Sequence, residues 1–325
     1  NTSDGLDLLY VRRPGSSILI RNTMAEGNAG NQLKTSGPAT IENCIAVGNC
    51  GFFDNQPFTY FVDPCRALGN TLSLALGTGD LVTVMNSTIT GEGDCLVLAD
   101  FSGTTPAGTE RVVLRNNIFL GFADYHQSYE NTCLTYGEHF ASDPFDMDYS
   151  VIQNVKGDPC PAGAHDLCGS PQLAGMTLDA FDAMPLSNSP AIDAGAVLTH
   201  ITADCAGVSR PLDGRNDGTN AWDIGAHEFV HPLADSDGDG MRDADETVAG
   251  TDAADAAAML SLESRGPADG PALGWWGVKG RIYGLEYAAE ATGDWAAVAG
   301  ATNLAGTNGW MGFSNPVPPT HRYFR

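Results

Sequence analysis

A short pattern that recurs four times in the first half of the chain restricts the possible fold more than any other feature. Each copy has an apolar stretch, an asparagine, small or polar residues, and a second apolar stretch closed by glycine. The copies occupy residues 19–27, 40–48, 83–91 and 113–121, and their asparagines are Asn22, Asn43, Asn86 and Asn116. Two short strands joined by a turn fit each copy, because the apolar residues alternate and show no helical period.

A second shared element precedes the pattern. Residues 4–8 lead into the first copy, and the similar residues 94–98 lead into the copy at 113–121. One such unit cannot bury its apolar face alone, whereas stacked units can, with asparagines hydrogen-bonded from one unit to the next. The sequence therefore predicts a mainly β fold in the form of a parallel β-solenoid. A β-sandwich is the main alternative, because strands separated by turns about every 8 to 12 residues also fit it.

Residues 235–246 carry the most specific chemical pattern of the chain, Asp-Ser-Asp-Gly-Asp-Gly-Met-Arg-Asp-Ala-Asp-Glu. Carboxylates at positions 1, 3, 5, 9 and 12, glycine at 6 and a backbone carbonyl at 7 are the arrangement of a Ca²⁺-binding loop. Neighbouring carboxylates repel one another unless a hard cation neutralises them. A solvated acidic linker is the alternative. We predict Ca²⁺ as a structural cofactor, bound by Asp235, Asp237, Asp239, the carbonyl of Met241, Asp243 and Glu246.

Three segments carry a resemblance to a known family. They are Asn-Ser-Pro-Ala-Ile-Asp-Ala-Gly at 188–195, Arg-Pro-Leu-Asp-Gly at 210–214 and Trp-Asp-Ile-Gly-Ala-His-Glu at 222–228. With them the chain resembles the secreted bacterial right-handed parallel β-helix proteins of the choice-of-anchor type, which have a pectate-lyase-like fold. The resemblance covers residues 1–230 and is strongest over 186–229. It implies a right-handed parallel β-helix whose closing rungs lie in that last part.

The remainder of the chain resembles two further elements of secreted bacterial proteins. Residues 231–258 look like a thrombospondin-type-3-like calcium repeat with a helix over 243–249. This similarity implies that Asp252 and Asp255 help to hold ions, although alanine stands where proline usually follows such aspartates. Residues 259–325 look like a small C-terminal β-sandwich, with strands in 275–287 and 295–298. The expected domains are therefore 1–230, 231–258 and 259–325.

The eight cysteines all precede the acidic loop and are spaced too widely for zinc or iron–sulfur ligation. Disulfides formed in an oxidising compartment fit better, with Cys160–Cys168 and Cys44–Cys50 as the nearest pairs. The spacing does not fix the connectivity, and buried free thiols are the alternative. His227 and His231 are four residues apart, a spacing that brings two histidines together on a helix. The region is expected to be the end of a strand, so we predict no metal there.

Charge limits the possible partners. Lys and Arg number 16 against 40 Asp and Glu, which gives a net charge of −24. Nucleic acids and anionic membranes are excluded, because binding to phosphate requires clustered Lys and Arg. No run of about 18 apolar residues predicts a membrane span. The chain begins at Asn1 without a leader pattern, so we expect a mature secreted chain, extracellular or at a cell surface.

The sequence assigns no catalytic residue. It contains neither a Gly-Xaa-Ser-Xaa-Gly elbow nor a His-Glu-Xaa-Xaa-His helix. A polysaccharide lyase or hydrolase would need an acid and a base. Acidic and basic residues that could serve are present, but their spacing matches no known catalytic motif. They are Arg111, Arg115, His126, His139, Asp143, Asp146 and Asp148. The aromatic residues between 121 and 150 are expected to pack an inserted loop, with stacking on sugar rings as the alternative.

The expected function is structural or adhesive, at the cell surface or in an extracellular filament. Residues 1–8 already match the middle of a unit and predict no capping helix. Either upstream units are missing, or a neighbouring copy covers this end by head-to-tail stacking. The expected partner is thus a second copy, an extracellular polymer or a surface glycan. The alternatives are a carbohydrate-active enzyme (polysaccharide lyase or glycoside hydrolase) and a lectin-like module using Trp275, Trp276 or Trp295.

Overall fold

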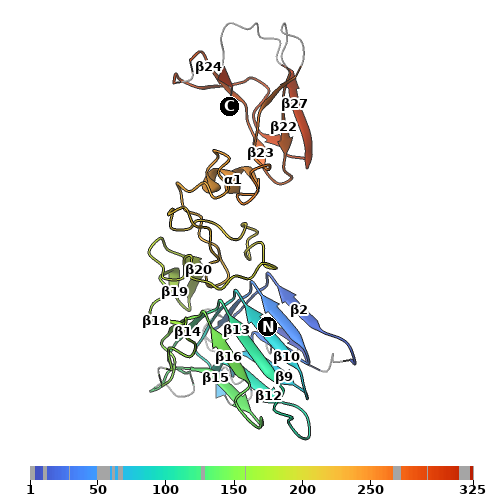
Figure 1. Cartoon of the computed structure of the whole chain (residues 1–325), viewed down its shortest axis with the longest axis vertical. Coiled ribbons are helices and arrows are strands. Elements are labelled where there is room, and N and C mark those ends of the chain that lie inside the picture. Colours follow the sequence, from blue (N-terminus) through green and yellow to red (C-terminus); the bar gives the residue numbers. More distant parts are fainter. Residues whose placement is uncertain are drawn as a thin grey trace. The chain divides into compact units, whose positions relative to one another are not determined.

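The computed structural model describes residues 4–324 except 10–12, 29, 50–58, 61–62, 65–68, 126–128, 158, 266–271, 291 and 315–322. The chain divides into two compact units, which we call unit 1 (Asn1–His231) and unit 2 (Pro232–Arg325) (Figure 1). This division groups the acidic loop with the C-terminal part, and the finer division into three domains stays a prediction. The described chain contains no helix with the length and apolarity needed to cross a bilayer.

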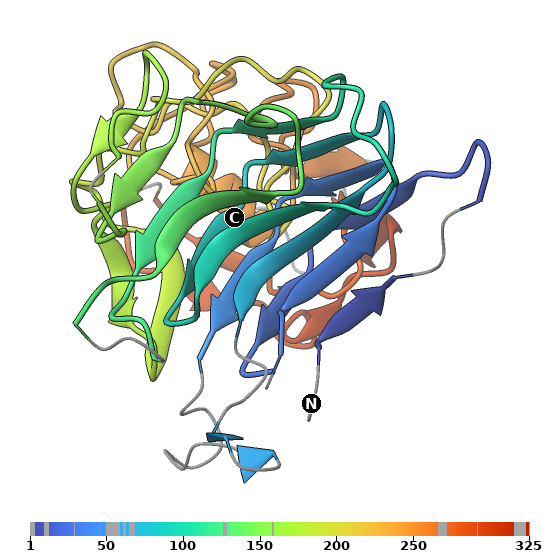
Figure 2. The ribbon, with the colours of Figure 1, turned by 90° about the horizontal axis from the view of Figure 1, so that it is seen from below.

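Three parallel sheets, called A, B and C, form most of unit 1, and the chain passes through them in turn (Figure 2). Sheet A contains β1 (Leu6–Leu8), β4 (Leu33–Ser36), β9 (Asn70–Leu76), β12 (Cys95–Phe101) and β15 (Cys133–Glu138). Sheet B contains β2 (Ile18–Arg21), β5 (Ala39–Glu42), β10 (Leu81–Met85), β13 (Arg111–Arg115) and β16 (Phe145–Asp148). Sheet C contains β3 (Met24–Glu26), β6 (Ile45–Gly48), β11 (Thr88–Gly91), β14 (Ile118–Gly121), β17 (Val151–Gln153) and β18 (Leu167–Cys168). The predicted mainly β fold is confirmed, and this parallel pairing does not suit a β-sandwich, whose sheets are antiparallel.

The four copies of the sequence pattern lie in register. Their first strands are β2, β5, β10 and β13, paired so that the residue before each asparagine faces its counterpart in the next copy. Asn22, Asn43, Asn86 and Asn116 all have a positive φ, between 44° and 56°. Asparagine tolerates this left-handed conformation better than most residues, which explains its recurrence at the turn. Asn116 donates from Nδ2 to Oδ1 of Asn86 over 3.4 Å. We call this line of residues the asparagine corner.

The core of unit 1 lies between the three sheets. Alternate residues point inward, as in β10 and β13, where Val82, Val84, Val112 and Leu114 are fully buried. Each buried side chain of this size contributes about 1.5 to 3 kcal/mol relative to exposure. The largest fully buried members of the continuous cluster are Leu33, Ile41, Leu72, Leu74, Leu76, Ile89, Leu96, Leu114 and Phe119.

Two disulfides are present in the described part of unit 1. Cys95–Cys133 joins the neighbouring strands β12 and β15, and Cys160–Cys168 is one of the two nearest pairs that the sequence indicated. The other indicated pair is wrong, because Cys44 is a buried free thiol. Its sulfur points into the core and donates to the carbonyl of Glu42 at 3.3 Å. Cys50 and Cys65 lie outside the described residues.

Removing the Cys95–Cys133 disulfide with paired alanines should lower the free energy of unfolding of unit 1 by about 4 kcal/mol. The bridge joins residues 38 apart, and the chain-entropy cost of closing such a loop is of that size. The matched control removes Cys160–Cys168, which spans 8 residues and should cost about 2.5 kcal/mol. Urea unfolding followed by near-ultraviolet circular dichroism measures both. Equal losses in the two variants would contradict the loop-closure explanation.

After β18 the chain leaves the stack of parallel strands. β19 (Leu173–Thr177) and β20 (Ala180–Pro185) form an antiparallel hairpin, and no strand follows until unit 2. The closing rungs expected over 186–229 are therefore not found. Instead this segment runs along the asparagine corner, because the amides there donate to its carbonyls. Nδ2 of Asn43, Asn86 and Asn116 reaches the carbonyls of Ala203, Asp223 and Ala196 at 2.7, 2.9 and 2.9 Å.

Unit 2 contains one helix among its described residues and several short antiparallel strands. The helix α1 (Asp243–Ala249) has the bounds expected from the sequence and ends at Gly250, whose φ is 83°. The expected strands over 275–287 and 295–298 are present in part, as short strands within these ranges. The pairings are β21 (Glu263–Arg265), β22 (Ala272–Gly277) and β27 (Gly309–Ser314); β23 (Ile282–Tyr283) and β26 (Leu304–Ala305); and β24 (Glu286–Ala288), β25 (Ala296–Ala297) and β28 (Tyr323–Phe324). A further hairpin, β7 (Thr59–Tyr60) and β8 (Asp63–Pro64), belongs to unit 1.

Candidate metal centre

The acidic loop folds so that three aspartates converge. Carboxylate oxygens of Asp235, Asp237 and Asp239 all lie within 4.8 Å of one another. Each aspartate also bends the loop by accepting a backbone N–H. Asp235 accepts from Gly240 at 3.0 Å, Asp237 from Asp239 at 3.1 Å, and Asp239 from Met241 at 2.7 Å. Gly240 has a φ of 97°, which explains the glycine at this position of the pattern.

Three carboxylate oxygens in this region are buried without a hydrogen-bond donor. They are Oδ2 of Asp237, Oδ2 of Asp239 and Oε2 of Glu246. Burial raises the pKa of Glu246 to about 7, and repulsion from the two aspartates adds to the shift. Its other oxygen, Oε1, accepts from the hydroxyl of Thr251 at 3.0 Å. Buried oxygens of like charge without donors are costly, and a hard divalent cation with oxygen ligands removes this cost. These residues therefore fit a bound metal ion.

The other predicted ligands are placed less directly. Both carboxylate oxygens of Asp243 accept from Ser236, one from its N–H at 2.7 Å and one from its hydroxyl at 2.6 Å. Position 9 of such loops often acts through a water, which agrees with this placement. Asp252 and Asp255 are exposed, and each accepts a backbone N–H of its own turn. The structure does not group these two with the three converging aspartates. Ligation by the Met241 carbonyl stays a prediction.

The loop is tied to the rest of unit 2 through α1. Glu246 lies in this helix, and its carbonyl accepts the N–H of Gly250 at 2.7 Å and of Thr251 at 3.1 Å. The hydroxyl of Tyr283, on β23, donates to the carbonyl of Ala249 at 3.2 Å. The residue at loop position 12 is thus one helical turn from a contact with the antiparallel strands. Changes at the acidic loop can therefore reach the core of unit 2.

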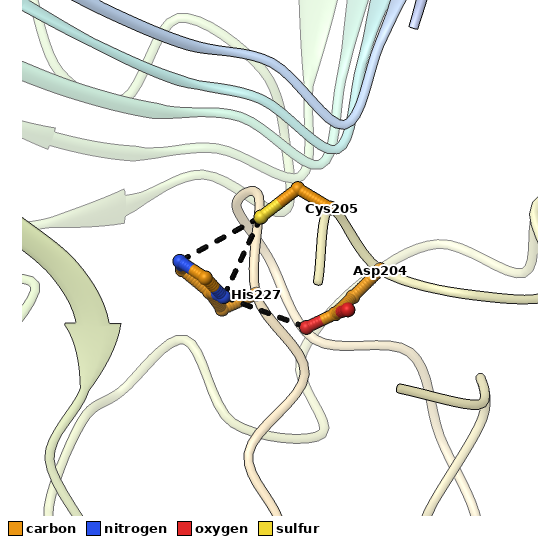
Figure 3. Close-up of side chains that lie close together, drawn as sticks. All are labelled: Asp204, Cys205 and His227. Atoms are coloured by element: carbon orange, nitrogen blue, oxygen red, sulfur yellow. Dashed lines mark hydrogen bonds and ion pairs between the residues drawn. The ribbon is translucent and has the colours of Figure 1, made fainter. Parts of the chain in front are cut away.

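A second cluster of metal-type donors lies in unit 1 and contains Asp204, Cys205 and His227 (Figure 3). Sγ of Cys205 is 3.5 Å from Nδ1 and 3.6 Å from Nε2 of His227. Nearly equal distances place the sulfur over the ring face, whereas the nitrogen lone pairs lie in the ring plane, so this geometry does not suit a shared ion. Burial opposes protonation of His227, but the hydrogen bond with Asp204 and the electrostatic influence of Asp204 and Cys205 outweigh it and raise its pKa to about 9.

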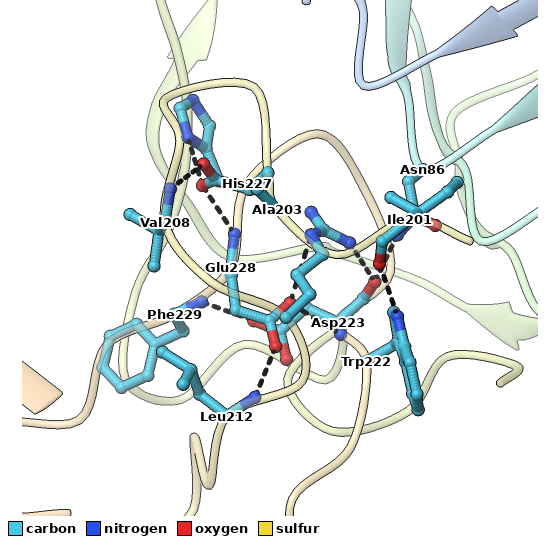
Figure 4. Close-up of polar contacts among 12 residues, drawn as sticks. Asn86, Ile201, Ala203, Val208, Leu212, Trp222, Asp223, His227, Glu228 and Phe229 are labelled. Carbon is cyan, nitrogen blue, oxygen red and sulfur yellow. Dashed lines mark hydrogen bonds and ion pairs between the residues drawn. The ribbon is translucent and has the colours of Figure 1, made fainter. Parts of the chain in front are cut away.

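Two of the segments that carried the family resemblance, 210–214 and 222–228, meet in a buried polar network (Figure 4). The side chain of Arg210 is fully buried and donates to the carbonyls of Asp223 at 3.2 Å and Gly225 at 2.9 Å. Its Nε lies 3.4 Å from Oε2 of Glu228, whose Oε1 accepts the N–H of Leu212 at 3.0 Å. The guanidinium thus lies near the Glu228 carboxylate and acts electrostatically on the buried Asp223 carboxylate. Burial raises the pKa of Asp223 to about 7 and also raises the pKa of Glu228.

The free energy of unfolding of unit 1 should fall as the pH rises from about 4 to about 7. The pKa of Asp223 is raised from 3.8 to about 7, so the folded state holds this proton more tightly than the unfolded state. The stabilisation is complete below the unfolded pKa and is lost as the pH passes the folded pKa, by up to about 4 kcal/mol. Urea unfolding across this range measures the slope. In Asp223→Asn the slope should flatten, and in the exposed control Asp182→Asn it should persist. A slope unchanged in Asp223→Asn would contradict this explanation.

The catalytic candidates do not form one site. Arg115 pairs with Asp146 at 2.7 Å across β13 and β16, whereas His139 pairs with Asp100 at 2.8 Å beside sheet A. Arg111 donates to backbone carbonyls, and Asp143 accepts the N–H of Phe145. Asp148, also on β16, pairs with His165 at 2.8 Å. His126 lies outside the described residues.

A groove that sequence reasoning did not indicate lies on the outer face of sheet A. Its volume is about 530 Å³. The residues lining it come from strands and loops far apart in the sequence, which is why no local pattern predicted it. They include three carboxylates, one cation and one exposed aromatic ring: Asp94, Asp124, Glu138, Lys156 and Tyr136.

Fold and loop together define a mainly β protein with stacked parallel sheets and an acidic loop suited to a metal ion. No family model, no curated protein and no solved structure matches this chain. Its function is therefore inferred from its own residues.

Proposed function

We propose that this chain is a secreted, calcium-stabilised, right-handed parallel β-helix protein with a structural or adhesive role at the cell surface or in an extracellular filament. The observation that carries the proposal is the set of buried, donor-less oxygens on Asp237, Asp239 and Glu246. Asp235 would complete the cage, with Asp243 acting through water. Bound Ca²⁺ would neutralise these carboxylates. Further contributions would come from the Met241 carbonyl, Asp252 and Asp255.

The rest of the chain supports a rigid extracellular scaffold. Strands that pass in turn through three parallel sheets are what a β-helix requires, and the asparagine corner repeats at the same turn in the four copies of the sequence pattern. Disulfides such as Cys95–Cys133 persist in oxidising compartments, outside the cytosol. The net charge of −24 favours solubility and disfavours polyanionic partners.

Binding of Ca²⁺ should depend on Asp239 and be independent of its neighbour Asp245. Asp239→Ala removes a donor-less oxygen of the cage and should abolish high-affinity binding in a calorimetric titration. Asp245→Ala is the matched control, because it removes a carboxylate from the same loop at a position without a ligand role. Asp245 is half exposed and pairs with Arg242 at 2.7 Å. Unchanged binding by Asp239→Ala would refute the calcium assignment.

Head-to-tail stacking of copies follows from the same scaffold. β1, β2 and β3 are the edge strands of sheets A, B and C at one end, and β15, β16 and β18 are those at the other. Such edges can pair with another chain, and a repeated end-to-end contact produces a filament. Electron microscopy of the full chain, with Ca²⁺ and after chelation, tests this. Filaments that disassemble on chelation support a structural subunit. Dispersed particles in both conditions exclude self-association, so that only the adhesive role remains as the proposal.

The groove on sheet A favours a second candidate function, that of a carbohydrate-active enzyme. Asp94, Asp124 and Glu138 offer acid and base groups beside Lys156, and Tyr136 offers a surface for a sugar ring. Incubation with neutral and acidic polysaccharides, followed by assays for reducing ends and unsaturated products, tests for hydrolase and lyase activity. Activity that Glu138→Gln abolishes supports the enzyme, and the absence of products from all polymers argues against it.

A further inference from the structure

The sheet formed by β21, β22 and β27 in unit 2 carries two exposed tryptophans side by side. Strands β22 and β27 lie side by side (Figure 1). Trp276 on β22 is directly paired with Trp310 on β27, and opposed residues of an antiparallel pair point to the same face. Trp276 is 58% exposed and Trp310 is 40% exposed. Trp275 points to the other face, where it is 3% exposed in the core. Of the tryptophans considered from sequence, Trp276 alone lies on this outer face, and Trp310 was missed.

A glycine determines how the second indole lies. A Cβ atom on Gly274 would be 2.7 Å from both Nε1 and Cζ2 of Trp310, so the indole lies directly against this backbone position. Only a residue without a side chain allows that arrangement. Gly274 is paired with Gly312 on β27 and with the exposed Glu263 on β21. The face is therefore flat beside the two rings, with a carboxylate at its edge.

We propose that this surface, the tryptophan face (Glu263, Gly274, Trp276, Trp310 and Gly312), binds an extended glycan built from uncharged sugars. A pyranose ring has a flat C–H side that packs on an indole, and the exposed indoles supply large apolar area. Its rim of hydroxyls can donate to a carboxylate, which Glu263 supplies. The negative charge of Glu263 and of the whole chain disfavours a polyanionic polymer. Uncharged sugars are thus the ligand class that fits.

The simpler role for such a pair is cross-strand stabilisation of the sheet. That role predicts a loss of stability when either ring is removed and no effect on any ligand. The inference goes beyond the proposed calcium-dependent scaffold and does not depend on it, since no residue of the face belongs to the acidic loop.

The test uses the full chain in the presence of Ca²⁺. Retention on insoluble cellulose and chitin is measured first, followed by tryptophan fluorescence titration with cellohexaose and chitohexaose. We expect binding to at least one neutral polymer, weakened about tenfold or more in Trp276→Ala and in Trp310→Ala. Gly274→Ala should weaken it as well, because the new methyl group displaces the indole of Trp310 without removing it. The matched control Ile282→Ala removes an apolar side chain that is 71% exposed on β23 and should bind as the parent chain does.

Three results would overturn the inference. The first is that neither neutral polymer retains the protein, and the second is that polygalacturonate binds more tightly than both neutral polymers. The third is that the two tryptophan variants bind with unchanged affinity. Asp239→Ala, measured in parallel, separates this inference from the proposed function. If calcium binding is absent in the parent chain but the glycan is retained, only the calcium proposal fails. If calcium binds and no glycan is retained, only the tryptophan face fails.

Discussion

Chelation of calcium should lower the stability of unit 2 and leave that of unit 1 unchanged. At a free Ca²⁺ concentration of about 100 times Kd, linkage adds about 2.7 kcal/mol to the folded state, and chelation removes it. Without a cation, the buried oxygens of Asp237, Asp239 and Glu246 have no donor, and the two aspartates repel Glu246. Glu246 is part of α1, so the loosening should extend to the contact between Ala249 and Tyr283. Scanning calorimetry with Ca²⁺ and with EGTA measures the shift.

Hydrogen exchange locates the effect within the chain. Peptides covering 235–251 should lose protection on chelation, whereas peptides covering β10 and β13 should not. Asp239→Ala should be insensitive to chelation, and Asp245→Ala should respond as the parent chain does. Equal loss of protection in both units, or no loss in either, would contradict a calcium site confined to unit 2.

Replacement of a corner asparagine by alanine should be among the most destabilising single changes in unit 1. Asn86 is fully buried and has a φ of 44°. Its Nδ2 donates to the carbonyls of Asp223 at 2.9 Å and Gly225 at 3.5 Å. Asn86→Ala should cost about 3 kcal/mol, because it adds left-handed strain of about 1 kcal/mol and removes two buried amide hydrogen bonds worth about 0.5 to 1.5 kcal/mol each. The two carbonyls then keep only their hydrogen bonds from Arg210. Urea unfolding measures the loss.

Two further variants separate the two causes. Asn86→Gly keeps the left-handed turn available and should lose mainly the amide hydrogen bonds. Asn22→Ala places alanine at an exposed corner with a similar φ of 50°, so it should lose mainly the conformational preference. A loss in Asn22→Ala as large as in Asn86→Ala would mean that contacts with the segment 186–229 contribute nothing.

Local patterns predicted much of unit 1 and the acidic loop. The alternation of apolar residues and the recurring asparagine describe a strand and its turn, which involve neighbours in sequence, and the four copies lie in register as a stack requires. The order of the aspartates in the loop likewise agrees with their convergence, because each one accepts an N–H within a few residues. The bounds of α1 also agreed. These features depend on interactions over short stretches of chain.

Long-range contacts decided the rest. The segment 188–228 was recognisable as a motif, yet its path along the corner depends on Asn86 meeting Asp223, 137 residues later. The core position of the Cys44 thiol, and hence its lack of a disulfide, depends on which strands stack around it. The tryptophan face depends on the register between β22 and β27, which places Trp310 beside Trp276.

By itself, the sequence determined a mainly β stack of repeated units and an acidic loop with calcium-type spacing, because strand alternation and turn conformation are local properties of the chain. The tertiary structure alone decided which amide meets which carbonyl, which thiols pair, and which tryptophans share a surface. Those outcomes follow from the pairing of segments distant in sequence, and no local pattern encodes that pairing.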